Sequence, residues 1–167
     1  MSYKITYSVP VDVAIEDTVE NVRNQVKRRT QRAANELRNS ALIVLRGQRS
    51  GRRYKVPGTY RRQRDKTDGK MKNGRYYTAS APGEPPAVRT GTFRNSWQVS
   101  PNSGRELYGS FFARIESDVR TDNGKYLLGE ILEEGTPGGK MAPRPYVEKT
   151  LEKAEPNIYR IYSEPYD

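Results

Sequence analysis

Residues 17–47 read DTVENVRNQVKRRTQRAANELRNSALIVLRG. The stretch opens on an acidic residue with Glu20 three positions later, which is the form of a capping box, and apolar residues then recur at helical steps of three, four and seven. Gly47 is a typical helix stop. The pattern predicts an amphipathic helix that begins after Asp17, ends near Arg46 and extends on the order of 45 Å. Such a helix in a small protein favours the wall of a ring or tube, although long amphipathic helices also pack ordinary cores.

The composition indicates one domain with a thin core. Of the 167 residues, 34% are hydrophobic and 30% are charged, and we expect a single domain spanning residues 1–167. Neighbouring subunits would help to complete such a core. The longest apolar run, residues 41–45, is far shorter than the roughly 20 residues of a membrane span. We therefore expect no membrane contact, and the N-terminus lacks the pattern of a secretory signal.

The chain contains neither cysteine nor histidine. This excludes disulfides, thiolate and imidazole metal sites, cysteine nucleophiles and every Ser-His mechanism. Carboxylate chemistry remains, and its candidates are Glu133 and Glu134, with Glu130 one helical turn earlier. These residues fall near the C-terminus of a predicted helix, where negative charge opposes the helix dipole. We therefore expect an acidic surface that faces solvent or a partner, and no catalytic residue, metal or cofactor.

The formal charge of the chain lies in one segment. Residues 46–75 hold twelve Lys and Arg against two acidic residues, a net charge of +10 (12 − 2), which equals that of the whole chain. Aliphatic residues are scarce here and glycines are frequent, so residues 47–75 predict a protruding arm that is mobile or ordered by a partner. The Asn73-Gly74 pair is typical of a hairpin turn. The candidate contact residues of this arm are Arg49, Arg52, Arg53, Lys55, Arg61, Arg62 and Arg64.

Three interpretations of the arm stay open. It could lie across an acidic neighbour, either the Glu130, Glu133 and Glu134 surface of the next subunit or an adjoining protein, and this is the interpretation we favour. Its arginines, with Tyr54 and Tyr60 between them, could instead bind nucleic acid, the guanidinium groups on phosphates and the rings on bases. The third interpretation is a solvated loop.

The rest of the chain predicts strands and short helices around the long helix. Strands are expected at residues 3–9, 76–80 and 107–119, the last with Phe111 to Val119 alternating between two faces, and a turn at 121–124. Pro82, Pro85 and Pro86 predict a stiff, extended connector. The architecture is α+β: a long N-terminal helix packed on a small, mainly antiparallel sheet, with a C-terminal helix and the protruding basic arm.

Three further helices are expected. Thr90 would cap a helix at 91–97 whose Phe93 and Trp97, at i and i+4, face the core. A second helix at 125–134 would end at Gly135. The last helix would start at Pro145, and Pro156 would end or kink it, leaving an apolar tail at 158–162. Its expected buried residues are Tyr146, Val147, Thr150, Leu151 and Ala154.

Two sequence blocks resemble a known family. The first, residues 81–97, reads APGEPPAVRTGTFRNSW, and the second joins EEGT at 133–136 to MAPRPY at 141–146. In order and spacing they resemble the head–tail joining (neck, or tail-completion) proteins of long-tailed bacteriophages, and the resemblance spans residues 76–154. In that family the first block precedes a strand pair and the second leads into the last helix. The motif residues are Pro82, Gly83, Thr90, Gly91, Phe93, Arg94, Gly135, Met141, Pro143, Arg144, Pro145 and Tyr146.

The resemblance implies a virion structural protein without catalysis, acting in tail completion or as a tail terminator. It would form a closed homo-oligomeric ring, expected to be a hexamer, in the neck between head and tail. Its partners would be further copies of itself, the adjoining portal, adaptor or stopper proteins and the tail-tube protein, with double-stranded DNA passing through the lumen. The location would be the virion, and the host cytoplasm during assembly. The alternative is a nucleic-acid-binding protein that uses the basic segment 46–75.

Overall fold

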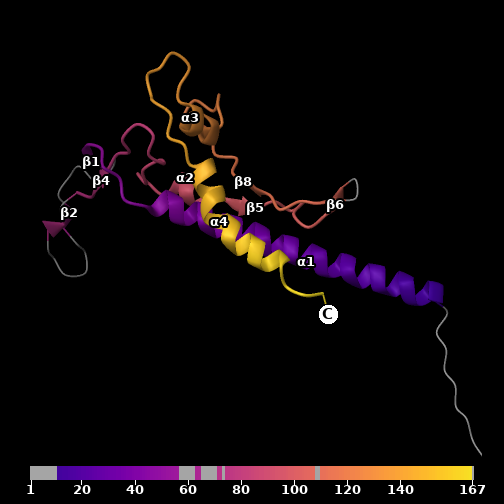
Figure 1. The fold of residues 1–167 in the computed structure, drawn as a ribbon. Coiled ribbons are helices and arrows are strands. Elements are labelled where there is room, and N and C mark those ends of the chain that lie inside the picture. Colours follow the sequence, from indigo (N-terminus) through magenta and orange to yellow (C-terminus); the bar gives the residue numbers. More distant parts are fainter. Residues whose placement is uncertain (1–10, 57–62, 65–70, 73, 108–109, 167) are drawn as a thin grey trace, which may run out of the picture.

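The computed structural model describes residues 11–56, 63–64, 71–72, 74–107 and 110–166. Figure 1 shows an α+β architecture, in which a long N-terminal helix packs against small antiparallel strand pairs and a C-terminal helix. The helices are α1 (Val11–Arg46), α2 (Thr92–Asn95), α3 (Leu128–Glu134) and α4 (Val147–Tyr162). The strands are β1 (Arg53–Lys55), β2 (Gln63–Arg64), β3 (Met71–Lys72), β4 (Tyr76–Thr78), β5 (Gln98–Val99), β6 (Glu106–Leu107), β7 (Ser110–Phe111) and β8 (Ile115–Glu116). The predicted fold class is confirmed.

Helix α1 ends where the sequence predicts and begins earlier. It ends at Arg46, and the Gly47 N–H donates to the Val44 carbonyl at 3.3 Å. Its first residue is Val11, so the expected capping box at Asp17 is wrong. The Thr18 hydroxyl instead donates to the Ala14 carbonyl at 2.7 Å, a bond that a threonine makes inside a helix rather than at its cap. With 36 residues, the helix is about 54 Å long.

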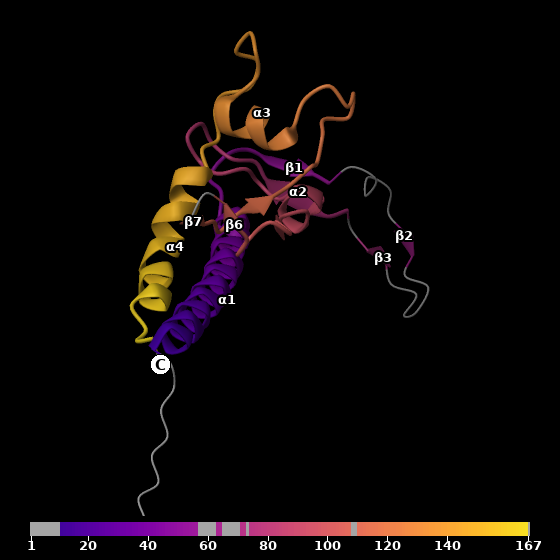
Figure 2. The ribbon, with the colours of Figure 1, turned by 90° about the vertical axis from the view of Figure 1, so that its right-hand side faces the viewer.

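Helix α4 lies antiparallel along α1 (Figures 1 and 2). The Tyr162 hydroxyl donates to Thr30 Oγ1 at 3.0 Å. Earlier in α4, the Asn157 amide donates to the Glu36 carboxylate, further along α1, at 2.7 Å. Four alanines are almost fully buried in the core of the described chain: Ala33, Ala34, Ala41 and Ala154. Small side chains of this kind let two helices approach closely, because interaxial distance depends on the residues at the contact.

The sequence predicted the extent of α4 only in part. The helix begins at Val147 with Tyr146 at its N-cap, and not at Pro145. Pro156 lies inside it, and residues 158–162, expected as a tail, are helical. Thr150, Ala154 and Ile161 are buried at helical spacing, and this packed face outweighs the hydrogen bond that Pro156 cannot make. Tyr146 is buried as predicted, whereas Val147 and Leu151 are exposed, at 45% and 53%.

The strands form four two-stranded antiparallel pairs in the described part of the chain. They are β1–β4, β2–β3, β5–β8 and β6–β7. The single strand expected at 107–119 is wrong in its extent, because Leu107 ends β6, which pairs antiparallel with β7, and β7 and β8 are separate strands. Residues Phe111 to Val119 do alternate between half-buried and exposed as predicted. The strand expected at 76–80 is present as β4. The strand expected at residues 3–9 lies outside the described residues, and so does Asn73 of the expected hairpin turn.

The shorter helices also differ at their ends. The turn at 121–124 is confirmed by a hydrogen bond from the Gly124 N–H to the Thr121 carbonyl at 2.7 Å. Helix α3 begins at Leu128, later than the expected residue 125, and Gly135 follows its end as predicted. Helix α2 has Gly91 at its N-cap, with a φ of 90°, so Thr90 is not the cap. The Thr90 hydroxyl still accepts a hydrogen bond from the Thr92 N–H at 3.4 Å.

Replacing Ala33 by leucine should overpack the contact between α1 and α4. Ala33 is 0% exposed, and extra methylene groups in a packed core typically cost about 1–3 kcal/mol. We expect the urea midpoint to fall accordingly. The matched control is Ala14→Leu on the exposed part of the same helix, where the change should stay within about 0.5 kcal/mol. Equal stabilities of the two variants would contradict this packing.

Candidate functional site

The Glu84 carboxylate holds the connector of residues 82–86 to the segment that follows α1. Glu84 accepts hydrogen bonds from the Ser50 hydroxyl at 2.6 Å, the Ser50 N–H at 3.1 Å and the Ala81 N–H at 2.9 Å. The bond from the Ser50 side chain, followed by those from the two backbone N–H groups, lowers the pKa of Glu84 from 4.5 to about 2. The carboxylate is therefore a fastener between two segments of chain.

Arg144 joins the second motif block to the first. Its guanidinium donates to the carbonyls of Ser80 and Ala81, the latter at 3.0 Å. The Gly83 N–H donates to the Pro143 carbonyl at 3.2 Å. The side chain of Lys149, in α4, donates to the Gly83 carbonyl at 3.0 Å. Two segments about 60 residues apart in sequence are therefore bound through backbone groups, which gives the connector a defined place above α4.

Three aromatic rings from the two motif blocks form a cluster. Phe93, Trp97 and Tyr146 meet edge to face, with ring centroids 5.6–5.9 Å apart. The Tyr146 hydroxyl donates to the Gly129 carbonyl at 3.3 Å, and burial raises the pKa of this hydroxyl. The Trp97 indole N–H is buried without a hydrogen-bond partner. Phe93 and Trp97 were expected in the core; they do face each other, but both are only half-buried, and Phe93 also lines the cavity described below.

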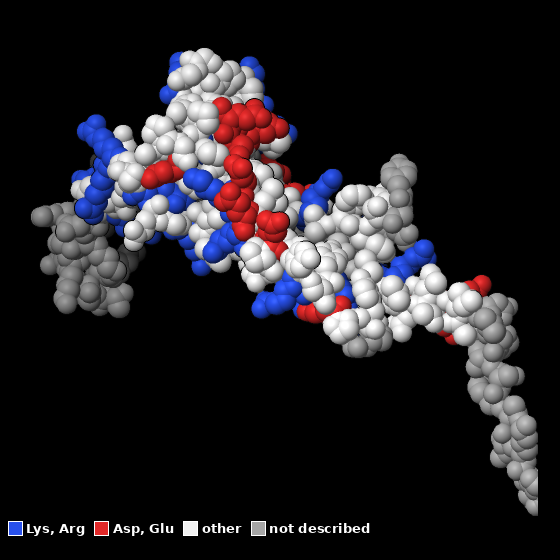
Figure 3. All heavy atoms as spheres, in the orientation of Figure 1, with Lys and Arg blue, Asp and Glu red and all other residues white. Residues whose placement is uncertain are grey.

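The acidic surface expected around α3 is partly used within the chain. Glu133 Oε2 accepts from the Tyr146 N–H at 2.9 Å and from the Val147 N–H at 3.3 Å. It therefore caps the N-terminus of α4, where a negative charge also suits the helix dipole. Glu130 and Glu134 are exposed. Figure 3 shows acidic side chains in a continuous band over α3 and α4.

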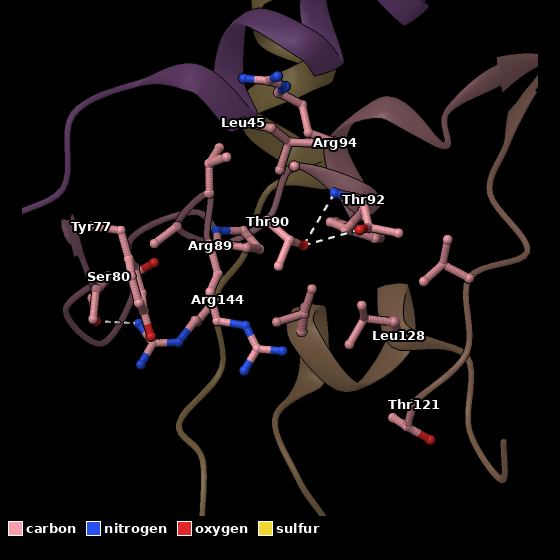
Figure 4. A pocket seen from close by; sticks show the side chains of 18 of the residues that line it. Leu45, Tyr77, Ser80, Arg89, Thr90, Thr92, Arg94, Thr121, Leu128 and Arg144 are labelled. Carbon is pink, nitrogen blue, oxygen red and sulfur yellow. Dashed lines mark hydrogen bonds between the residues drawn. The ribbon is translucent and has the colours of Figure 1, made fainter. Parts of the chain in front are cut away.

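A cavity of about 700 Å³ opens between the connector, α2, α3 and the end of α1 (Figure 4). Leu45, Phe93 and Leu128 contribute apolar surface to its lining. The positively charged lining residues are Arg89, Arg94, Arg120 and Arg144, and the motif residues Thr90, Gly91 and Met141 also line it. Asp122 adds one carboxylate to this lining.

Arg49 was expected to contact a partner, but its side chain binds groups within the chain. Its guanidinium donates to the Val44 carbonyl at 2.8 Å and to the Pro86 carbonyl at 3.1 Å. Burial lowers the pKa of this guanidinium. Arg49 therefore ties the connector to the C-terminal end of α1.

Five side chains on and beside β1 and β4 form what we call the basic ladder: Arg52, Arg53, Tyr54, Lys55 and Tyr76. All five are exposed. The Arg53 guanidinium lies 4.6 Å from the centre of the Tyr76 ring, and the Tyr54 ring stacks on Tyr77 with centroids 5.9 Å apart. Arg61 and Arg62 lie outside the described residues, and Arg64 lies in β2, which pairs with β3. The ladder presents cations held over aromatic rings.

Comparison of the chain with protein-family models, with curated proteins and with solved structures finds no match. In the part of the chain that the structure describes, no helix is both long and apolar enough to cross a membrane. Within the same part, no group of three or more Asp, Glu, His or Cys side chains is placed to hold a metal ion. The fold and these contacts are therefore the basis for a functional proposal.

Glu84 should make stability depend on acid pH. Because its pKa falls from 4.5 unfolded to about 2 folded, its stabilising contribution is present above pH 4.5 and is lost as the pH falls towards 2. We expect Glu84→Gln to have a lower urea midpoint than the natural chain at pH 6, and a smaller difference at pH 2.5. Other carboxylates titrate in both proteins, so the difference isolates Glu84. A difference that stays constant with pH would contradict the assignment.

Glu133 should act as the cap of α4. Removing its side chain leaves the Tyr146 and Val147 N–H groups without their acceptor, and loss of a helix cap costs about 1 kcal/mol. We expect Glu133→Ala to lower the free energy of unfolding by about that amount, measured in urea. The control is the exposed neighbour Glu134→Ala, with an expected change within about 0.5 kcal/mol. Equal effects of the two substitutions would rule out the cap.

Proposed function

We propose that the chain is a structural protein of the neck of a long-tailed bacteriophage, where it forms a ring that joins the head and its portal complex to the tail. The observation that carries the proposal is the thin core. Among the described residues, seven hydrophobic side chains are buried, and four of these are alanines. Fourteen large hydrophobic side chains are exposed. In the proposed ring, neighbouring subunits would bury part of this exposed apolar surface.

The elongated shape supports a repeated contact between copies of the chain. Figure 1 shows α1 extending beyond α4 at one end, while the basic ladder lies towards the other. Contacts between different surfaces of identical subunits generate a ring when the rotation closes. A hexamer is the expected stoichiometry, from the resemblance to neck proteins. The function is assembly, in tail completion or as a tail terminator, without catalysis.

The motif blocks would serve as rigid connections in this ring. Glu84, Arg144 and Arg49 fasten the connector to α1 and to the loop before α4, and a surface fixed in this way loses little entropy on binding. The adjoining portal, adaptor or stopper protein, or the tail-tube protein, would dock against such fixed loops. Double-stranded DNA would pass through the lumen. The protein would reside in the virion, after assembly in the host cytoplasm.

A second candidate function, nucleic-acid binding, is favoured by one observation. The basic ladder exposes cations and tyrosine rings together, the two groups that bind phosphates and stack on bases. Its signature would be an affinity that falls steeply with salt, with a log–log slope of about −0.9 for each phosphate neutralised on duplex DNA. A ring protein would not need such binding to join heads and tails.

Phage particles made without the chain should fail to join. Electron microscopy of lysates, with heads, tails and complete virions counted separately, should show filled heads beside finished tails. Supplying the chain in trans should restore complete virions, because the missing part is the connecting ring. The matched control is the chain with Glu134→Ala, an exposed position that we expect to restore joining. Normal complete virions in the absence of the chain would refute the neck function and favour nucleic-acid binding.

A further inference from the structure

The N-terminal part of α1 extends beyond the elements that cover the rest of the helix (Figure 1). Residues 14–24 are all exposed. Among them Ile15, Val19 and Val22 are 57%, 53% and 38% exposed. Their spacing of four and three places them on one stripe of the helix. At the same helical spacing this stripe leads to the buried Ala33, so it extends the face that is buried in the core.

The same part of α1 is acidic. Residues 14–22 include Glu16, Asp17 and Glu20 and contain no Lys or Arg. All three carboxylates belong to exposed residues. An apolar stripe with acidic neighbours is complementary to a surface that offers apolar rings and positive charge.

The basic ladder has both of these properties. Its Tyr54 and Tyr76 are 45% and 47% exposed. Residues 46–56 include five Lys and Arg and no Asp or Glu. Arg49 is turned inward onto the Pro86 carbonyl, and Arg46 belongs to α1, which leaves the three exposed cations of the ladder against three acidic residues on the N-terminal part of α1. Figure 3 shows lysines and arginines at the end of the molecule that holds the ladder and acidic side chains at the projecting end of α1.

We infer that the N-terminal part of α1 docks on the basic ladder of a second copy of the chain. Ile15, Val19 and Val22 pack against the tyrosine rings, and the carboxylates of α1 pair with the cations beside them. One chain cannot make this contact with itself, because the 28 helical residues from Val19 to Arg46 span about 40 Å. The contact joins different surfaces of two subunits, as a ring requires. It supplies the subunit interface of the proposed neck ring and rests on that function.

Disulfide cross-linking tests the contact directly, since the chain has no cysteine of its own. Val19→Cys combined with Tyr54→Cys places one thiol on each proposed surface. We oxidise the concentrated full chain, and purified virions that carry it, under mild conditions. We expect trimers and larger covalent oligomers on a non-reducing gel. Either single variant can form dimers at most. The matched control is Glu152→Cys with Tyr54→Cys, which probes the acidic band on α4 instead.

The outcomes separate the interface from the function. Covalent oligomers larger than dimers that form with Val19→Cys and Tyr54→Cys, and do not form with Glu152→Cys and Tyr54→Cys, support the contact. The contact is overturned if these larger oligomers form only with the Glu152→Cys variant. It is also overturned if neither double variant forms oligomers larger than dimers, in solution and in virions. If Val19→Cys alone forms dimers and the double variant forms no larger oligomers, the contact is also overturned, in favour of a symmetric contact. The particle count without the chain decides the neck function separately. If heads and tails fail to join without the chain, and the double variant forms no oligomers larger than dimers, the function stands and the interface is wrong.

Discussion

The antiparallel packing of α4 on α1 is the constraint on which the rest of the structure depends. Alanines at the buried contact let the two helices approach closely, and the bonds from Tyr162 to Thr30 and from Asn157 to Glu36 set their register. Because α4 is fixed in this way, its N-terminus lies near the C-terminal end of α1. Helices α2 and α3 lie at this end of the molecule (Figure 2), and the connector is bonded to it through Arg49.

The two motif blocks fasten distant segments of the chain to one another. Glu84 and Arg144 bind mostly backbone groups, and such bonds hold segments in place whatever side chains lie nearby. The Glu133 carboxylate has the same character, since it caps α4. The described core is small, and the rigidity around the connector comes from these polar contacts. Much of the apolar surface of the described chain therefore stays exposed.

The sequence predicted the elements that depend on local periodicity. The end of α1 follows from its apolar spacing and from Gly47 after it, and the alternating faces of residues 111–119 and the pairing of Phe93 with Trp97 follow from side-chain spacing. The features that it missed depend on distant groups. Asp17 has the form of a cap, but α1 begins six residues before it. Arg49 and Glu133 turn towards backbone groups 37 and 13 residues away, and Pro156 is tolerated because α4 is packed on α1.

The central claim is that the apolar and charged surfaces of this chain are completed by other copies of itself in a ring between head and tail. Cryo-electron microscopy of the neck of complete virions tests that claim most directly. The result we predict is a closed ring, built from copies of this chain, in which the projecting end of each α1 is covered by its neighbour. A neck without density for the chain, or with separate copies that do not contact one another, would contradict it.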